Sequence, residues 1–291
     1  MKITRREFIA GSAGAVAGAV LFSRLADAAP GKVLVGACDW SLGERAKLEG
    51  VDVAKACGLD GLEISASNKP EDVLDIVNPD WRRQYKEKMA AAGITAPSTA
   101  MGFLNSAPLA SDPRGPAWLE QTIEGTKDLG AKIILLAFFG NGDLRDKRGN
   151  LKPKDVDVVV ERLKDAAPKA KECGVILGLE NTLSAKQNIE IIERAKSDSV
   201  RVYYDVRNST DNGYDVPAEL RFLGDRICQI HFKDGKDYLG EGKVAMPPVA
   251  EALAEIEYDG WIVLETSSPS KDRIADFRKN AEFVRDLLKP A

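Results

Sequence analysis

The segment Val175-Ile-Leu-Gly-Leu-Glu180 is apolar for five residues and then ends in a glutamate. Similar segments follow it in the second half of the chain: Val200-Arg-Val-Tyr-Tyr-Asp205, Ile227-Cys-Gln-Ile-His231 and Trp261-Ile-Val-Leu-Glu265. Short runs that are almost continuously apolar and rich in β-branched residues are typical of strands buried on both faces, as in parallel sheets. We therefore predict four parallel strands, each ending in a residue that can bind a metal ion.

Four more segments of the same kind precede these, so that eight predicted strands alternate with amphipathic stretches. They cover residues 33–38, 61–65, 94–101 and 133–138. Helices are clearest in the second half, where apolar residues recur with a helical period. The predicted helices there cover residues 156–172, 188–195, 248–256 and 273–288. This order predicts an α/β fold of the (β/α)₈ TIM-barrel class in a single domain.

Glycines stand shortly before several predicted strands, where each would end a helix and turn the chain back toward the barrel. They are Gly58, Gly93, Gly130, Gly174 and Gly260. Glycine is favoured there because the residue after a helix often adopts a left-handed conformation.

The first 28 residues have the three parts of an export signal. A positively charged start contains Arg5 and Arg6, a Gly/Ala-rich apolar stretch follows, and Ala26-Asp27-Ala28 supplies a cleavage site. The adjacent arginines resemble a twin-arginine signal, so we expect the twin-arginine translocase as a partner during export. An uncleaved membrane anchor is the alternative. We expect the body, residues 29–291, in the periplasm or secreted, without stable membrane association after cleavage.

The composition excludes some classes of partner and site. Residues 1–28 contain four of the 41 Lys and Arg and two of the 45 Asp and Glu, so their removal changes the formal charge from −4 to −6. A mildly acidic surface argues against nucleic-acid binding, which needs a basic patch. The remaining 263 residues are close to the roughly 250 of one barrel.

The four cysteines form no Cys-x-x-Cys pair, so the sequence predicts buried free thiols rather than a zinc site. They are Cys38, Cys57, Cys173 and Cys228.

The last residues of predicted strands 5 to 8 are three acids and one histidine: Glu180, Asp205, His231 and Glu265. In a (β/α)₈ barrel the active site lies at the C-terminal ends of the strands. A charged group at the end of a buried strand is unfavourable unless it is paired or bound to a metal. Four neighbouring strands that present such side chains to one opening therefore predict a shared divalent metal ion.

Oxygen ligands with one imidazole nitrogen suit Mn²⁺, Mg²⁺, Co²⁺ or Zn²⁺. Export in the folded state allows loading in the cytoplasm, and for this reason we favour Mn²⁺ over ions of higher intrinsic affinity. Two other interpretations stay open. His231, the only histidine in the chain, could be a core residue bonded to a backbone carbonyl. Glu180 and Asp205 could instead form ion pairs with Arg207 or Lys233.

The motifs around these residues resemble the xylose-isomerase-like superfamily of sugar isomerases and epimerases, particularly the branch with ketose 3-epimerases and hydroxypyruvate isomerase. The resemblance covers the whole body of the chain. It rests on Leu-Glu-Asn at 179–181, Tyr-Asp at 204–205, His-Phe-Lys-Asp at 231–234, Gly-Glu-Gly at 240–242 and Leu-Glu at 264–265. In that branch the residues that end strands 5 to 8 bind one metal ion, which implies this role for Glu180, Asp205, His231 and Glu265.

The resemblance also implies chemistry on a carbohydrate. A metal chelated by a carbonyl and the neighbouring hydroxyl acidifies the C–H bond between them. Glu180 and Glu265, on opposite sides of that carbon, would then remove and return a proton through an enediolate. Return to the opposite face gives an epimer, and return to the neighbouring carbon gives an isomer.

Other residues near the predicted strand ends are candidates for substrate contact. Trp40 follows the first strand and Glu63 is placed at the end of the second. Asn181 and Lys233 adjoin predicted metal ligands. Each of the four could instead have a structural role. Trp40 could be a buried core residue and Asn181 a strand-end cap, whereas Glu63 could be a paired rim residue and Lys233 a solvated one.

Two positions depart from the resemblance. Ketose epimerases typically carry a second histidine where this chain has Asn208, and an arginine where it has Asp237. Both positions contact substrate in those enzymes, so Asn208 remains a candidate substrate contact of different chemistry. The metal site is therefore better supported than the identity of the substrate.

Three functions from different classes follow. The leading one is an isomerase or epimerase of a free sugar or keto-sugar, since export disfavours phosphorylated substrates and no glycine-rich phosphate loop is present. A lyase or dehydratase of keto-glycosides would use the same proton abstraction. A non-catalytic sugar- or metal-binding barrel is the third, because one fold hosts many functions. The oligomeric state is left open.

Overall fold

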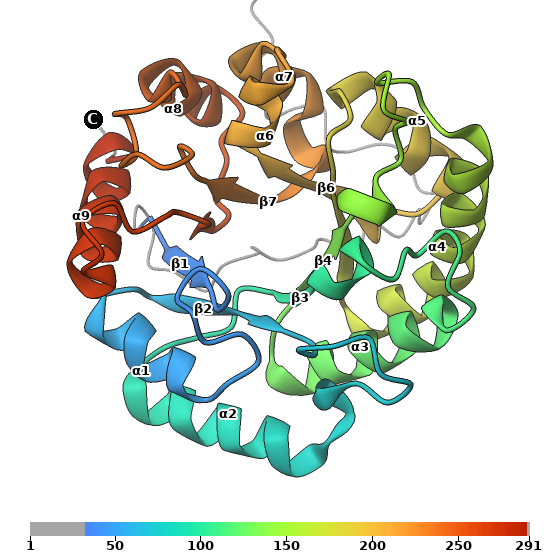
Figure 1. Ribbon diagram of the computed structural model, residues 1–291, viewed down its shortest axis with the longest axis horizontal. Coiled ribbons are helices and arrows are strands. Elements are labelled where there is room, and N and C mark those ends of the chain that lie inside the picture. Colours follow the sequence, from blue (N-terminus) through green and yellow to red (C-terminus); the bar gives the residue numbers. More distant parts are fainter. Residues whose placement is uncertain (1–32, 290–291) are drawn as a thin grey trace, which may run out of the picture.

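The computed structural model describes residues 33–289, and the predicted export signal lies outside this range. Within it, eight parallel strands form a closed barrel in chain order, in which β8 pairs with β1 (Figure 1). The strands are β1 (Val35–Cys38), β2 (Gly61–Ser65), β3 (Thr99–Met101), β4 (Ile133–Ala137), β5 (Ile176–Glu180), β6 (Val200–Asp205), β7 (Ile227–Phe232) and β8 (Ile262–Leu264). The predicted single (β/α)₈ TIM barrel is confirmed.

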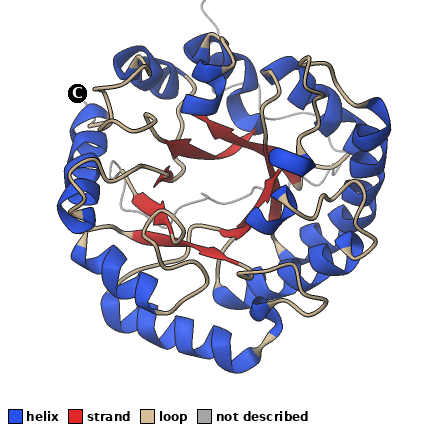
Figure 2. Cartoon of the chain, viewed as in Figure 1, coloured by secondary structure: helices blue, strands red, loops and turns tan. Residues whose placement is uncertain are grey.

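Helices form an outer ring around the strands (Figure 2). The α-helices are α1 (Glu49–Ala56), α2 (Pro79–Ala92), α3 (Gly115–Leu129), α4 (Pro153–Cys173), α5 (Ala185–Ala195), α6 (Val206–Asp211), α7 (Val216–Leu223), α8 (Met246–Glu255) and α9 (Arg273–Leu287). Short 3₁₀ segments are η1 (Asp75–Val77), η2 (Gly102–Asn105), η3 (Gly140–Gly142) and η4 (Gly224–Arg226). The four helices predicted in the second half correspond to α4, α5, α8 and α9, and their ends differ from the predicted ends by three residues or fewer.

Glycines end most of the helices for which this was predicted. Those with a left-handed φ are Gly58, Gly93, Gly130 and Gly174. Gly260 does not have this role, because α8 is followed by Ile256 and the positive φ belongs to Glu257. The position shortly before a strand therefore does not by itself identify the residue that ends the helix.

The third strand is shorter than predicted. β3 contains Thr99–Met101, whereas we expected residues 94–101. Pro97 has no N–H to donate to a neighbouring strand, and before it Thr95 forms only an isolated bridge with Gly61. The segment therefore approaches β2 without forming a continuous ladder.

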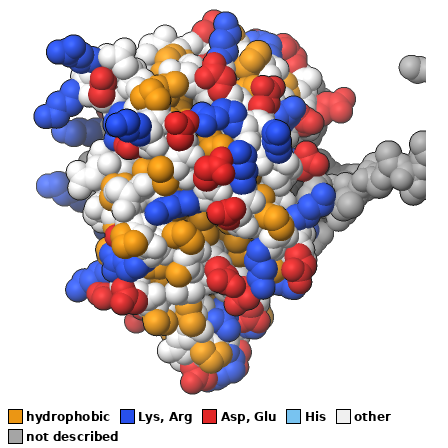
Figure 3. Space-filling model, turned by 90° about the vertical axis from the view of Figure 1, so that its right-hand side faces the viewer, with side chains coloured by type: hydrophobic (Ala, Val, Ile, Leu, Met, Phe, Trp, Pro, Cys, Tyr) orange, Lys and Arg blue, Asp and Glu red, His pale blue; other side chains and the backbone are white. Residues whose placement is uncertain are grey.

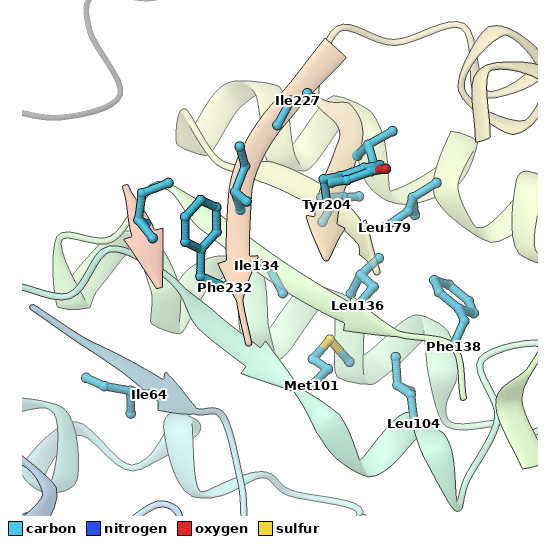
Figure 4. Packing of buried hydrophobic residues seen from close by; sticks show 14 of the residues in the cluster. Ile64, Met101, Leu104, Ile134, Leu136, Phe138, Leu179, Tyr204, Ile227 and Phe232 are labelled. Carbon is cyan, nitrogen blue, oxygen red and sulfur yellow. The ribbon is translucent and has the colours of Figure 1, made fainter. Parts of the chain in front are cut away.

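Strand residues alternate between two apolar layers. On β4, Ile134 and Leu136 belong to the layer between strands and helices, whereas Ile133 and Leu135 pack inside the barrel. Figure 4 shows part of the first layer, where side chains such as Phe232 project from neighbouring strands. This alternation turns every second residue toward the barrel axis, and it carries the polar residues of the site inward.

The outer surface carries charges of both signs. On the face shown in Figure 3, Lys and Arg side chains are interspersed with Asp and Glu, and apolar side chains are scattered among them. No helix between residues 33 and 289 is both long enough and apolar enough to cross a membrane.

Candidate active site

The four predicted metal ligands lie together at the C-terminal end of the barrel. Glu180 and Asp205 are the last residues of β5 and β6. His231 is next to last in β7, and Glu265 directly follows β8. The strands are in register there, since Asp205 pairs with His231 across β6 and β7. Their apolar neighbours in sequence face the helices, so these side chains point into the barrel.

The ligand atoms of this group converge on one region. One atom from each of the four side chains lies within 4.8 Å of each of the others. His231 Nδ1 is 3.0 Å from Glu180 Oε1 and 3.6 Å from Glu265 Oε2. The same nitrogen is 4.0 Å from Asp205 Oδ2. Glu265 is partly exposed and the other three are buried, so the group opens toward the solvent on the Glu265 side.

The donor set fits a divalent cation. Asp205 Oδ2 is buried and accepts no hydrogen bond from the residues that the structure describes. Lys233 Nζ forms an ion pair with it at 3.1 Å, but not along a hydrogen-bond direction. A buried acceptor without a hydrogen bond is unfavourable. A hard ion bound by Asp205, Glu180 and Glu265 oxygens would satisfy it.

The surroundings shift the pKa values of the three acids in different directions. Burial raises the pKa of Glu180 to about 7 and also raises the pKa of Asp205. Burial acts in the same sense on Glu265, but the positive charges of Lys233 and His231 and the hydrogen bonds from Lys233 and Trp40 together outweigh it. The pKa of Glu265 therefore lies below its usual value. In the metal-free site, Glu265 is therefore the most readily ionised of the three acids.

Lys233 and Trp40 hold Glu265 through both carboxylate oxygens. Lys233 Nζ donates a hydrogen bond to Glu265 Oε2 at 2.5 Å, and Trp40 Nε1 donates to Oε1 at 3.0 Å. The Trp40 ring also meets His231 edge-on, with centroids 6.0 Å apart. Both candidate substrate residues thus lie against predicted metal ligands. Lys233 and Arg207 were suggested as ion-pair partners of the site acids. Lys233 pairs with Asp205 and Glu265. Arg207 pairs instead with Asp211 and Asp234, outside the group of predicted ligands.

Glu63 lies deeper in the barrel than a substrate contact would. It is the middle residue of β2 rather than its last, and its side chain is fully buried. Glu63 Oε1 is 3.0 Å from His231 Nε2. Its Oε2 accepts hydrogen bonds from Ser98 Oγ at 2.5 Å and Tyr203 OH at 2.8 Å. Gln229 Nε2 donates to both of these hydroxyls, at 2.7 and 2.8 Å.

The partners of Glu63 were not predicted as part of the site. Ser98, Tyr203 and Gln229 are polar residues in or beside apolar strands, and all three are buried. Buried polar groups need partners, so Gln229 inside an otherwise apolar strand was the available signal. Burial raises the pKa of Tyr203 well above its ordinary value, which keeps the phenol protonated and able to donate.

Cys38 belongs to a second group of converging ligand atoms, with Glu63 and His231. Burial raises the pKa of Cys38 to about 12, so the thiol keeps its proton. The thiol donates to the carbonyl oxygen of Leu264 at 3.2 Å. The four-residue group offers three carboxylates and one imidazole, so it is the better candidate for a hard divalent cation. All four cysteines are free as predicted, although Cys173 is only half-buried.

The two candidate asparagines differ in availability. Asn181 Nδ2 donates to Asn188 Oδ1 at 2.8 Å, and its Oδ1 accepts from the Leu183 N–H at 2.9 Å, so this side chain braces the start of α5. The Asn208 N–H donates to Asp205 Oδ1 at 2.6 Å, and through this bond Asp205 caps the start of α6. Asn208 Nδ2 is buried and has no hydrogen-bond partner in the described part of the chain. Its amide is therefore free to bind an acceptor.

Asp234 organises the loop that follows β7. Its side chain is fully buried and accepts hydrogen bonds from the N–H groups of residues 242–244 at 2.8 to 3.0 Å. It also forms an ion pair with Arg207 at 3.2 Å. The loop is thereby fixed directly after Lys233, whose ammonium contacts the candidate ligands.

Known proteins resemble this chain in sequence and in fold. The family profile described as xylose isomerase-like TIM barrel matches residues 51–287. The proposed L-ribulose-5-phosphate 3-epimerase SgbU of Escherichia coli K12 is 27% identical over 267 residues, covering 82% of this chain and 90% of SgbU. Inosose dehydratase of Lacticaseibacillus casei is 28% identical over 194 residues, and the match spans 54% of this chain but only 65% of that enzyme. The structure of 3-keto-D-glucoside 4-epimerase YcjR from E. coli has a TM-score of 0.72 at 18% identity, over 88% of this chain and 100% of YcjR, which establishes likeness of fold alone.

Proposed function

The chain belongs to the xylose isomerase-like TIM barrel family, and we propose that it is a divalent-metal-dependent isomerase or epimerase of a non-phosphorylated sugar or keto-sugar. One observation carries the proposal: the ligand atoms of Glu180, Asp205, His231 and Glu265 converge within 4.8 Å at the barrel mouth. Carbohydrate chemistry is supported by the names of relatives, which include a sugar-phosphate epimerase and an inosose dehydratase.

The four converging residues would hold one metal ion, with His231 contributing Nδ1. We favour Mn²⁺, and Mg²⁺, Co²⁺ and Zn²⁺ suit the same donors. When bound, the ion polarises a carbonyl oxygen of the substrate and acidifies the adjacent C–H bond. Trp40 and Lys233 keep the Glu265 carboxylate in one orientation, which limits the number of arrangements that the reacting groups can sample.

Glu180 and Glu265 are the candidates for proton transfer. Lys233 lowers the pKa of Glu265, so its carboxylate is ionised at neutral pH and takes the proton from the α-carbon. Glu180 is the second carboxyl group of the site and would return a proton from the opposite side of that carbon. Return to the opposite face of the carbon gives an epimer, and return to the neighbouring carbon of the enediolate gives an isomer.

Substrate analysis with matched variants tests this function. Protein purified without chelators should contain one equivalent of a divalent metal by elemental analysis. Incubation with a panel of ketoses and 3-keto-glycosides in D₂O should place deuterium on the α-carbon of the true substrate, detected by NMR. Glu265→Gln is the matched control, since it keeps an oxygen ligand but cannot take a proton. Absence of both metal and deuterium exchange in the parent protein would refute the proposal.

A lyase or dehydratase is the second candidate. It is favoured by Asn208, which stands where ketose epimerases typically carry histidine, and by the similarity to inosose dehydratase. Elimination begins with the same proton removal but releases a leaving group, so product analysis in the same D₂O experiment separates the two reactions. If neither reaction occurs and the protein binds metal or sugar, a non-catalytic binding barrel becomes the better explanation.

We also propose that the protein is exported by the twin-arginine translocase to the periplasm or beyond. The proposal rests on Arg5, Arg6 and the Ala26-Asp27-Ala28 site. Substituting both arginines with lysine should retain the protein in the cytoplasm, as measured by cell fractionation, while a Lys2→Arg variant should be exported normally. Export of the double variant would exclude this route.

A further inference from the structure

We infer that Glu63 is a positioning residue that holds the imidazole of His231 with its Nε2–H toward Glu63 and its Nδ1 toward the metal ion. The inference rests on the proposed function and deepens it. Glu63 contacts a metal ligand, whereas its own side chain is fully buried beneath the site. The inference replaces the substrate contact that the sequence suggested for this residue.

The two ring nitrogens of His231 face different surroundings. Nδ1 faces the site acids and is 3.0 Å from Glu180 Oε1. Nε2 faces away from them and is 3.0 Å from Glu63 Oε1. A neutral imidazole has one N–H and one lone pair, and a metal takes the lone pair. With the metal on Nδ1, the proton must lie on Nε2, where Glu63 is the acceptor within reach.

The donors and acceptors around Glu63 are ordered so that Oε2 accepts from two hydroxyls and Oε1 is left to accept from the histidine. The amide of Gln229 donates to the hydroxyls of Ser98 and Tyr203, so both hydroxyls act as acceptors toward Gln229. Their own protons then point to Glu63 Oε2. Two donors occupy Oε2, and Oε1 accepts from His231 Nε2–H.

The ring itself is held against rotation. Tyr203 packs against His231 edge-on with centroids 4.6 Å apart, and Trp40 does so at 6.0 Å. A 180° ring flip would exchange Nδ1 with Cδ2 and Nε2 with Cε1, so that a C–H group would take the place of Nδ1 among the site acids. Carboxylates that accept from a metal-bound histidine are a recurring way to fix its tautomer. Glu63 would therefore keep the Nε2 proton and leave Nδ1 to the metal in the loaded site.

The single histidine of the chain makes the tautomer directly measurable. The full-length protein, purified without a histidine tag and labelled with ¹⁵N, is loaded with Zn²⁺ as a diamagnetic probe. Long-range ¹H–¹⁵N correlation spectra should contain one imidazole, protonated at Nε2 and metal-bound at Nδ1. A spectrum with the proton on Nδ1 in the zinc-loaded parent protein would overturn the inference.

Metal affinity provides the second measurement. Glu63→Gln should weaken Zn²⁺ binding, measured by titration against a competing chelator, about 10- to 100-fold, and it should broaden or shift the imidazole ¹⁵N signals. Glu219→Gln is the matched control. Glu219 likewise accepts from a tyrosine, Tyr204 OH at 2.9 Å, and from the Ala185 N–H, but it has no contact with His231. Its Zn²⁺ affinity should stay within about twofold, below the range for outer-shell changes.

The outcomes separate this inference from the proposed function. If the parent protein binds no divalent ion, the metal-enzyme proposal fails. If it binds Zn²⁺ and Glu63→Gln has unchanged affinity and unchanged imidazole signals, only the role of Glu63 is refuted. If Glu63→Gln does not fold, Tyr203→Phe takes its place, because it removes one donor to Oε2 and leaves the carboxylate. Tyr203→Phe should weaken Zn²⁺ binding by a smaller factor, and parental affinity in that variant would count against the inference.

Discussion

Glu180 and Glu265 have the same functional group, and their neighbours give them different acidities. Glu265 receives hydrogen bonds from an ammonium and an indole N–H, and it is partly exposed. Glu180 is buried against His231 and has no cation as close as Lys233 is to Glu265. In the metal-free site Glu265 is therefore the more acidic of the two, which makes it the candidate base.

Glu265→Gln should separate catalysis from binding. The amide keeps an oxygen for the metal but cannot accept a proton, so kcat should fall by about 10²- to 10⁴-fold. Metal content should remain near one equivalent. Steady-state kinetics and elemental analysis of the same preparation check both points, and full activity in this variant would remove Glu265 from the proton-transfer role.

Metal affinity should depend on pH near neutrality. Burial raises the pKa of Glu180 to about 7, so below pH 7 the metal-free protein holds a proton that the metal must displace. Affinity should therefore fall as pH falls, and the displacement of this one proton contributes up to about tenfold per pH unit between pH 7 and 5. Calorimetric titration at several pH values measures the slope. Glu180→Gln should have a shallower slope, and equal affinity at pH 6 and 8 in the parent would contradict the expectation.

At this scale the sequence predicted where the ligands are, but not how deep each inward residue lies. Glu180, Asp205 and His231 stand at or next to strand ends, and that position alone puts them at the barrel mouth. Glu63 points inward on the same principle, but it stands two residues before the end of β2, one layer further down. The end of a strand is set by its hydrogen bonds to the neighbouring strands, and the sequence of β2 alone does not show where these bonds stop.

Among the elements, the loop after β7 has its own internal support. Asp234 binds the N–H groups of residues 242–244, so a side chain performs the role that strand pairing performs elsewhere. Because Lys233 directly precedes Asp234, disorder in this loop would be transmitted to the ammonium beside Glu265.

Asp234→Ala should therefore reduce both stability and site order. The change leaves the N–H groups of residues 242–244, of which that of Val244 is buried, without an acceptor and removes a partner of Arg207. This should lower the free energy of unfolding by about 3 kcal/mol. Urea denaturation measures this loss. Asp237→Ala, in the same loop but exposed, is the control and should change stability by less than about 0.5 kcal/mol. Equal effects of the two variants would argue against the bracing role.

The elements themselves were largely predictable, because apolar runs and helical periodicity are local properties. The exceptions have local physical causes. Pro97 interrupts the predicted third strand because it cannot donate a ladder hydrogen bond. Glu257 takes the left-handed conformation that was expected at Gly260. The partners of Asn181 were not predictable, since its amide is bound by a residue on the following helix.

For the whole molecule, one ion would connect four consecutive strands, β5 to β8. Such an ion binds only the folded chain, so it stabilises the fold by mass action. At a metal concentration 100 times the Kd, this amounts to about 2.7 kcal/mol, or an increase in Tm of about 5 to 10 °C for a chain of this size.

Removing the metal should reverse this gain. Thermal unfolding measured with added Mn²⁺ and after chelator treatment should give the expected difference in Tm, and Asp205→Asn should reduce it. The same Tm in the presence and absence of metal would show that the four side chains do not bind an ion together.

The division of the site between the two halves of the barrel has a practical consequence. All four ligands come from residues 180–265, whereas Trp40, Glu63 and Ser98, which support Glu265 and His231, come from the first half. The turn at residues 146–150, between these halves, is exposed. A chain cut there would give one fragment with all four predicted ligands and another with Trp40, Glu63 and Ser98. Recovery of tight metal binding on mixing would then report complementation of the two fragments.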